Sequence, residues 1–310
     1  MNKKDIQMGI FYAGFSYFIW GILPIYWKLL DHVSSDEILA NRIFWSFIFM
    51  MFILVFSRKW GELIVTIKSF RANKKELYAL LAASLFISCN WFLYIWSVNN
   101  NHLIEASLGY YINPLVSVLL GMIFFREKLS PAQFVSFFMA IIGVLILTIS
   151  YGKFPWVSVI LALSFGFYGL LKKMVKVDSA IGLTLETLVV TPISLAYMIF
   201  LFVKGNQSFL SISVETDLLL ISAGAATAIP LLYFAKGAQK IPMATLGFLQ
   251  FIAPTLTLIL GVFFYHEHFS RIHFVSFLFI WTAIMLYSVS KTKLYHQLEM
   301  KWKKGRSVGV

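Results

Sequence analysis

The chain has 310 residues, of which 59% are hydrophobic and only 13% charged, and its mean hydropathy is +0.79. A soluble domain carries roughly a quarter charged residues, so the composition excludes a soluble globular protein and indicates a chain that lies in a lipid bilayer. The net charge of +12 comes without a basic helix, a glycine-rich phosphate loop or interleaved aromatic and basic residues, so no nucleic-acid partner is expected. The single cysteine, Cys89, excludes an internal disulfide and a cysteine-ligated zinc ion.

Ten apolar segments are long enough to cross a bilayer as helices, which takes about twenty residues each. The first, residues 7–29, is too long for a signal-peptide core and lacks a small-residue cleavage site, so we expect it to remain as a span. The other nine are predicted at residues 37–57, 76–98, 103–125, 131–150, 155–173, 180–203, 216–235, 242–265 and 271–290. The predicted fold class is an all-α membrane protein with ten transmembrane helices.

The distribution of lysine and arginine predicts the orientation of these spans. If the N-terminus is cytoplasmic, 21 basic residues, Lys172 and Lys173 among them, fall on the inner side and four fall outside, while Arg42 lies within a span. Because cytoplasmic segments carry the excess of lysine and arginine, both termini are predicted to be cytoplasmic, in the cytoplasmic membrane of a prokaryote. The charge is then expected to meet anionic lipid. Residues 58–75 are expected to form an amphipathic segment on the inner face.

The segment at residues 112–137 recurs 140 positions later, at residues 252–277. Shared residues include Pro114 with Pro254, Gly121 with Gly261, Glu127 with Glu267, and the run at 134–137 with that at 274–277. Each half holds five spans, an odd number, so the second copy is predicted to enter the membrane inverted. The expected organisation is a first repeat at 1–150, a second at 151–290 and a basic cytoplasmic tail at 291–310. Inverted repeats are a common plan of secondary transporters, which bind substrate near the midplane between the halves.

Several longer strings run through nearly the whole chain: "WGILPIYWKLL" at 20–30, "DEILANRIFWS" at 36–46, "NWFLYIWSVNN" at 90–100, "HLIEASLGYYINPL" at 102–115, "FYGLLKK" at 167–173, "LETL" at 185–188, "IPLLYF" at 229–234 and "TLGFLQFIAPTL" at 245–256. In these strings the sequence resembles the RarD-type permeases of the EamA family, in the drug/metabolite transporter (DMT) superfamily. The resemblance implies a ten-span inverted-repeat fold, a central cavity and transport of small metabolites or drugs, with no settled substrate. Asn41 departs from the histidine that such permeases often carry before the arginine, which argues against a histidine proton relay there.

The first candidate site residue is Glu186, because a charge at the bilayer centre costs about 2.5–3.5 kcal/mol and usually marks function. It lies in the seventh predicted span, six residues before Pro192, and the repeat places it near the counterpart of Arg42. One interpretation is that Glu186 binds a cation or a proton within the cavity. The alternative is that Glu186 and Arg42 form a structural ion pair.

The fourth predicted span supplies a second group of candidates. Glu105 opens this span, where the helix dipole favours a carboxylate, so it is expected to serve as a structural cap. Alternatively, a helix that Pro114 locally opens lines the cavity on one flank with Glu105, Tyr110, Tyr111 and Asn113.

Aromatic and amide side chains in the third and ninth spans complete the set. Asn90, Trp91 and Tyr94 offer a hydrogen-bonding amide beside aromatic surfaces, which suits an amphiphilic ligand or a cation, or else interhelical packing. Gln250 is the repeat partner of Tyr110 and is open to the same two interpretations.

The end of the first span is rich in aromatic residues. Tyr26 and Trp27, followed by Lys28, are typical of an interfacial belt with a basic anchor. Trp20 lies one to two turns deeper in the same span, deep enough to face the cavity.

The remaining signals favour transport over enzymatic activity. His266, His268 and His273 lack the i, i+4 spacing that puts two ligands on one helix face, so no metal or other cofactor is expected. The sequence has no Ser-His-Asp order, no paired carboxylates within spans and no phosphate-binding loop, which argues against an enzyme and against ATP-driven pumping. A secondary transporter is predicted; a membrane-embedded sensor or enzyme is the alternative. Coupling to protons and assembly as a homodimer are left open.

Overall fold

The computed structural model describes residues 3–100, 102–266 and 269–292. Over these residues the chain forms twelve helices and no strand: α1 (Lys3–Lys28), α2 (Ser35–Phe56), α3 (Trp60–Ser69), α4 (Lys74–Asn99), α5 (Leu103–Phe124), α6 (Pro131–Tyr151), α7 (Trp156–Met174), α8 (Ser179–Lys204), α9 (Val214–Ala238), α10 (Met243–Gln250), α11 (Ile252–Phe263) and α12 (Arg271–Ser290). The expectations for Glu267, His268 and the tail from residue 293 fall outside the described residues.

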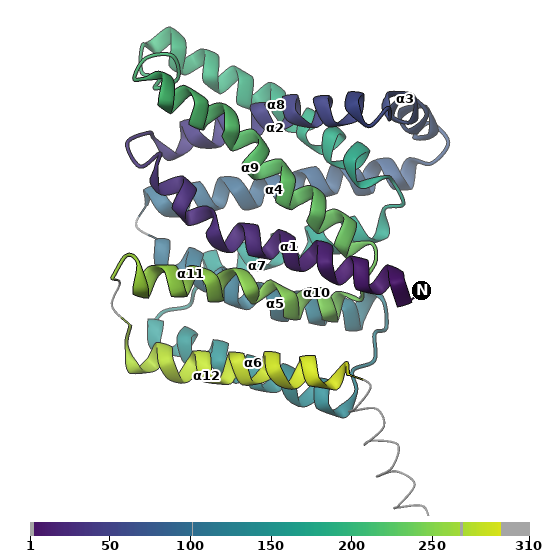
Figure 1. The fold of residues 1–310 in the computed structure, drawn as a ribbon, viewed down its shortest axis with the longest axis vertical. Coiled ribbons are helices and arrows are strands. Elements are labelled where there is room, and N and C mark those ends of the chain that lie inside the picture. The colour runs from purple at the N-terminus through teal and green to yellow at the C-terminus, as the bar shows by residue number, and fades with distance from the viewer. Residues whose placement is uncertain (1–2, 101, 267–268, 293–310) are drawn as a thin grey trace, which may run out of the picture.

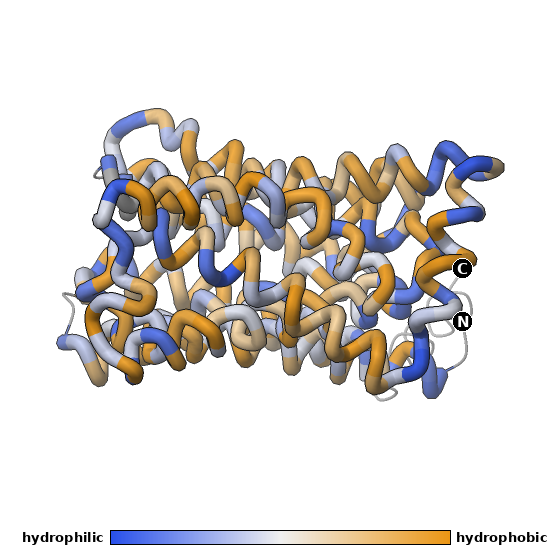
Figure 2. Tube along the Cα trace, turned by 90° about the horizontal axis from the view of Figure 1, so that it is seen from above, coloured by the Kyte–Doolittle hydropathy of each residue, from blue (hydrophilic) through white to orange (hydrophobic). Residues whose placement is uncertain are grey.

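The prediction of an all-α protein with ten membrane spans is confirmed. Ten segments are long and apolar enough to cross a membrane: every helix except α3, with α10 and α11 together forming one span. Most hydrophilic segments lie towards the two ends of the long helices, with apolar residues between them (Figure 2). The short α3 exposes Trp60 and buries Leu63, as expected of the amphipathic segment.

The packing of the helices keeps its pattern when the two halves of the chain are exchanged. In this exchange α1, α2, α4 and α5 of the first half correspond to α7, α8, α9 and the α10–α11 pair of the second. The contact of α5 with α7 then matches that of α10 and α11 with α1. Likewise, α2 contacts α9 as α8 contacts α4, and α1 contacts α9 as α7 contacts α4. α6 packs on α12 at one edge of the molecule, while α2 and α8 pack together towards the opposite edge (Figure 1). α1 begins and α12 ends on the same side (Figure 1). This pattern is the one expected of a duplicated five-helix unit; which side is cytoplasmic stays a prediction.

Small residues let some of these helices approach very closely. A Cβ atom placed on Gly224 of α9 would lie 2.3 Å from the carbonyl carbon of Trp45 in α2. A Cβ atom on Gly247 of α10 would lie 2.6 Å from the carbonyl oxygen of Pro114 in α5. Close backbone approach through small residues is a common way to pack membrane helices, so Gly224 and Gly247 serve packing.

The two repeated prolines do not have the same effect. α5 runs without a break through Pro114, so the expectation that this proline opens its helix is wrong. In the second copy the helix is interrupted at Phe251, between α10 and α11. Pro254 has no N–H to donate to the carbonyl of Gln250, the last residue of α10, which accounts for the position of this break.

Asp178 fixes the start of α8 and joins it to the α2–α3 connection. Its carboxylate accepts hydrogen bonds from the N–H groups of Ala180 and Ile181 and lies 2.5 Å from Nζ of Lys59. Burial alone would raise the pKa of Asp178, but the hydrogen bond and charge of Lys59, together with the two N–H groups, outweigh it and hold the pKa below its usual value.

We expect Asp178→Ala to lower the free energy of unfolding by about 0.5–2 kcal/mol, because the cap is lost. Asp178→Asn keeps a capping oxygen and removes only the charge. Since the pKa is lowered in the folded state, the charge stabilises the fold above the unfolded-state pKa of about 3.9 and this contribution is lost as the pH falls through the folded-state pKa. Unfolding midpoints in detergent at acidic and neutral pH measure the loss of the cap and the loss of the charge. If the midpoint depended on pH equally in wild type and in Asp178→Asn, the stabilising effect of the charge would be contradicted.

Candidate functional site

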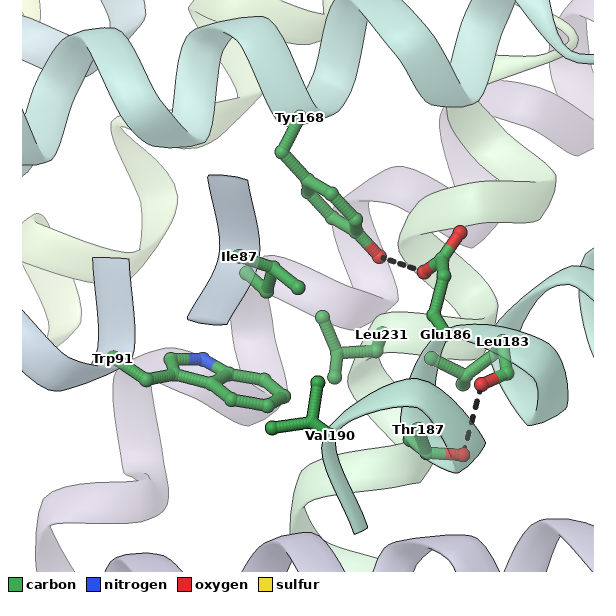
Figure 3. A pocket seen from close by; sticks show the side chains of 8 residues that line it. All are labelled: Ile87, Trp91, Tyr168, Leu183, Glu186, Thr187, Val190 and Leu231. Atoms are coloured by element: carbon green, nitrogen blue, oxygen red, sulfur yellow. Dashed lines mark hydrogen bonds between the residues drawn. The ribbon is translucent and has the colours of Figure 1, made fainter. Parts of the chain in front are cut away.

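A small pocket lies between α4, α7, α8 and α9. Figure 3 shows its lining residues: Ile87, Trp91, Tyr168, Leu183, Glu186, Thr187, Val190 and Leu231. Its volume of about 10 Å³ leaves room for no more than about one water molecule. The carboxylate of Glu186 is the one charged group on its wall, so a strongly polar group faces an otherwise largely apolar pocket.

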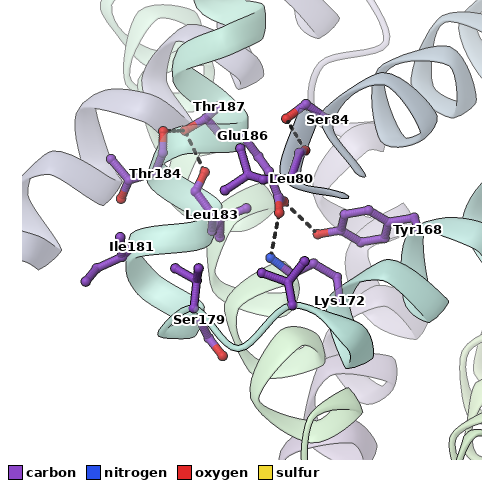
Figure 4. Close-up of polar contacts among 12 residues, drawn as sticks. Leu80, Ser84, Tyr168, Lys172, Ser179, Ile181, Leu183, Thr184, Glu186 and Thr187 are labelled. Carbon is purple, nitrogen blue, oxygen red and sulfur yellow. Dashed lines mark hydrogen bonds and ion pairs between the residues drawn. The ribbon is translucent and has the colours of Figure 1, made fainter. Parts of the chain in front are cut away.

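Glu186 forms a buried ion pair with Lys172. Its Oε1 lies 2.8 Å from Nζ of Lys172, and the hydroxyl of Tyr168 donates to Oε2 at 3.3 Å (Figure 4). Both charged side chains are about 95% buried, with 5% and 4% of their surfaces exposed. The alternative in which Glu186 pairs with Arg42 is therefore wrong: the partner is Lys172.

Lys172 was not recognised from the sequence as a site residue. Because Lys172 stands near the end of a predicted span, it counts among the basic residues expected on the inner side. In the structure it is buried in the last turn of α7. Helical spacing is the signal that could have found it, because Tyr168 and Lys172 are four residues apart and share one face of the helix.

Arg42 lies among aromatic rings contributed by three other helices. Its Cζ atom is 5.3 Å from the ring centre of Trp27 in α1 and 5.2 Å from that of Trp91 in α4. Tyr94 of α4 and Tyr110 of α5 lie close to it, and their rings pack edge to face with centres 6.1 Å apart. Trp27 is therefore more than the interfacial anchor expected from the sequence. We call these five residues the Arg42 cluster.

The charge of Arg42 has no acidic partner among the described residues. No carboxylate lies within 4 Å of it, no hydrogen bond from its guanidinium to the described part of the chain is present, and its Nε atom is buried without a partner. A cation–π contact contributes about 0.5–2 kcal/mol, and a charge within a membrane span costs about 2.5–3.5 kcal/mol on the insertion scale. The two tryptophans thus offset part of that cost and leave the donors of Arg42 unused.

The amide candidates make interhelical hydrogen bonds. Asn90 donates to the carbonyl of Leu161 and to the hydroxyl of Ser164, each at 2.9 Å, and so joins α4 to α7. Gln250 donates to the hydroxyl of Ser117 at 2.9 Å and joins α10 to α5. Asn113 is buried, and its side-chain oxygen has no partner in the described part of the chain.

Trp20 lies in an aromatic cluster, away from the Arg42 cluster. Its ring contacts those of Tyr17, Phe165 and Phe234 at centre distances of 5.4, 5.7 and 5.8 Å. These contacts join α1 to α7 and α9. Tyr168 stacks on Phe234 at 5.7 Å, so the same aromatic cluster supports the hydroxyl that contacts Glu186.

Two further carboxylates are buried by structural contacts. Glu105 lies 2.8 Å from Nδ1 of His102 and accepts hydrogen bonds from the hydroxyl of Tyr151 at 2.8 Å and the N–H of Val157 at 3.2 Å. It therefore caps the start of α7; at the start of its own helix, α5, the capping position His102 makes no side-chain hydrogen bond to the backbone. Glu37, which sequence reasoning missed, accepts hydrogen bonds from the N–H groups of Ser208 and Phe209. Glu37 lies in the first turn of α2, where acidic residues are common, so nothing in the sequence singles it out.

Five of the ten candidate residues thus lie in two groups that meet at Trp91: Glu186 in one, and Arg42, Trp91, Tyr94 and Tyr110 in the other. The Lys172–Glu186 pair lies near the start of α8 and the Arg42 cluster near the start of α2. Glu186 and Arg42 each lie seven residues, about 10 Å of helix, after the first residue of their helices. Trp91 lines the pocket and also contacts Arg42. Within the described residues no three His, Cys, Asp or Glu side chains gather in a way that could hold a metal ion.

Comparison with known proteins identifies the family. The model of the EamA-like transporter family matches residues 7–149 and again 155–289. The uncharacterized transporter YojE of Bacillus subtilis is 48% identical over 294 residues, which are 94% of this chain and 97% of that protein. Protein RarD of Escherichia coli is 39% identical over 287 residues, 93% of this chain and 96% of that protein.

More distant matches agree. The chloramphenicol-sensitive protein RarD of Pseudomonas aeruginosa is 29% identical over 264 residues, 85% of this chain and 88% of that protein. A solved crystal structure with 17% identity superposes with a TM-score of 0.69, covering 96% of this chain and 100% of that one, which shows a shared fold. The chain is therefore a multi-pass membrane protein that belongs to the EamA-like transporter family, within the RarD-type group of the DMT superfamily.

Proposed function

We propose that this protein is a secondary transporter of small metabolites or drug-like compounds in the cytoplasmic membrane of a bacterium. The observation that carries the proposal is the Lys172–Glu186 pair, whose glutamate lies on the wall of a pocket between helices of both halves. Ionisable residues inside a membrane protein are costly and most often mark the path of a substrate or an ion. A relative named as an uncharacterized transporter, and a more distant one named as a chloramphenicol-sensitive protein, support the same interpretation and a role other than catalysis.

The small volume of the pocket supports alternating access. With room for about one water molecule, the pocket admits a substrate only after helices around it move apart. α4 belongs to the first half, and α7, α8 and α9 belong to the second. Rocking of one half against the other would therefore open the pocket on one side at a time and expose Glu186 and Trp91.

Transport itself is tested by reconstituting the purified protein in liposomes. We expect saturable flux of at least one member of a library of small metabolites and drug-like compounds, with and without an imposed pH gradient. Protein-free liposomes are the control. Flux no greater than the control for every compound would contradict the proposal and favour a sensor or an enzyme.

Glu186 is the proposed proton carrier, because a carboxylate paired with a buried lysine can take up a proton when the pair separates and release it when the pair forms again. We expect Glu186→Gln to abolish the acceleration of flux by a pH gradient, while a substrate gradient alone still drives transport. Glu62→Gln, which removes an exposed carboxylate from α3, is the matched control and should behave as wild type. An unchanged response of Glu186→Gln to the pH gradient would exclude proton transfer at this residue.

A further inference from the structure

Arg42 differs from the buried charges around it. Among the described residues, Glu37, Glu105, Lys172 and Glu186 are the buried charged side chains, and each has a hydrogen-bond or ionic partner. Arg42, with its buried Nε atom, has neither. Its donors are therefore available to an acceptor that is not part of the described chain.

The second half of the chain indicates what that acceptor is. Arg42 and Glu186 occupy the same position, seven residues after the first residue of α2 and α8 respectively. Counted over the same 144 positions that separate the starts of α2 and α8, Lys28 at the end of α1 corresponds to Lys172 in the last turn of α7. In the second half a lysine and a glutamate neutralise each other at 2.8 Å. In the first half both positions carry positive charge; Lys28 is 65% exposed and reaches Asp31 at 3.4 Å, while Arg42 remains unpaired. The group that would neutralise Arg42, as Glu186 neutralises Lys172, is a carboxylate.

The surroundings of Arg42 fit a small organic anion with an apolar body. Trp27 and Trp91 present aromatic surfaces beside the guanidinium. Tyr110 packs edge-on against Tyr94 yet keeps 51% of its surface exposed, so part of its aromatic surface is accessible next to the charge. A guanidinium binds a carboxylate through two parallel N–H···O bonds, a geometry that lysine cannot reproduce.

We propose that the Arg42 cluster binds the carboxylate of the substrate, and that the substrate class is small organic acids with an aromatic or otherwise apolar body. As a statement about substrate this inference rests on the proposed transport function. Trp91 then links recognition to access, because it contacts Arg42 and lines the pocket that holds Glu186.

Binding can be measured without transport, by titrating the purified protein in detergent and following tryptophan fluorescence, since two of the contacting residues are tryptophans. The probes are benzoate and its neutral analogue benzamide, which differ only in the group that would meet Arg42. We expect saturable quenching by benzoate and at least about 10-fold weaker binding of benzamide. Arg42→Gln should weaken benzoate binding by at least about 10-fold, because a hydrogen-bonded charge pair is lost.

Two further variants keep the test decisive if Arg42→Gln fails to fold. Arg42→Lys keeps the positive charge but loses the planar guanidinium that can donate two parallel hydrogen bonds. This variant should bind benzoate more weakly than the wild-type protein does, and it should still bind benzoate more tightly than benzamide. Lys28→Gln removes an exposed positive charge beside Trp27 and should leave benzoate affinity unchanged. Equal affinities for benzoate and benzamide, or a loss in Lys28→Gln as large as in Arg42→Gln, would overturn the inference.

The same liposomes separate this inference from the transport proposal. Flux of neutral or cationic solutes in a protein that does not bind benzoate would refute the anion site and leave transport standing. Benzoate binding that depends on Arg42, in a protein that moves no solute, would refute transport and leave the anion site standing.

Discussion

Lys172→Met is expected to lower the free energy of unfolding by about 3–5 kcal/mol, because it leaves the carboxylate of Glu186 buried without a counter-charge. Glu186→Leu should have a similar cost, since it leaves Lys172 unpaired. The double variant Lys172→Met/Glu186→Leu should recover most of the loss, because replacing both members of a buried pair with apolar groups is often nearly neutral.

Thermal unfolding in detergent, followed by size-exclusion chromatography of the remaining folded fraction, measures all three variants. Lys236→Met, in the last turn of α9, is the control for the loss of a partly exposed lysine and should change the midpoint little. If the two single losses simply added in the double variant, the pair would have no coupling energy and its assignment as an ion pair would be wrong.

Gly224→Ala is expected to be the most damaging replacement of a glycine by alanine in the interior of a long helix. The new Cβ atom would lie 2.3 Å from the carbonyl carbon of Trp45 and 2.6 Å from its Cβ atom, so α9 and α2 must separate. Overpacking of this kind costs about 1–3 kcal/mol, and the rigidity of two helix backbones places the expected value at or above the upper end.

The matched control is Gly14→Ala in α1, where the added Cβ atom meets nothing within 4 Å. That change should stabilise the protein slightly, by roughly 0.5–1 kcal/mol, because alanine loses less conformational freedom in a helix than glycine does. Unfolding midpoints of the two variants should therefore move in opposite directions. A Gly224→Ala midpoint at or above that of wild type would show that α2 and α9 are not in the close contact described.

The ten spans and α3 could be predicted because each depends on local sequence. A membrane helix must satisfy its own backbone hydrogen bonds and bury about twenty apolar residues, so hydropathy alone locates it. Glu186 was found for the same reason, as a carboxylate far from any predicted loop. Its partner was missed, because Lys172 stands close to a helix end, where a count of charges treats every lysine as facing water.

The aromatic surroundings of Arg42 could not be predicted, because they come from helices that meet only in the folded protein. Trp27 ends α1 and Trp91 lies in α4, and nothing in their local sequences links them to α2. The different outcomes at Pro114 and Pro254 have the same origin. The local motif is shared, but α5 stays continuous where Gly247 packs against it, and the second copy is interrupted at Phe251.

The opposite charges of Arg42 and Glu186 at one shared helix position make the two halves of this chain complementary and no longer interchangeable. An antiparallel assembly of two first halves would carry an arginine at this position in both copies and a glutamate in neither. An assembly of two second halves would contain the Lys172–Glu186 ion pair twice and no unpaired arginine at this position. Fusion of the two halves into one polypeptide therefore places one arginine and one glutamate at this helix position in every molecule, which a symmetric dimer of either half alone would not do.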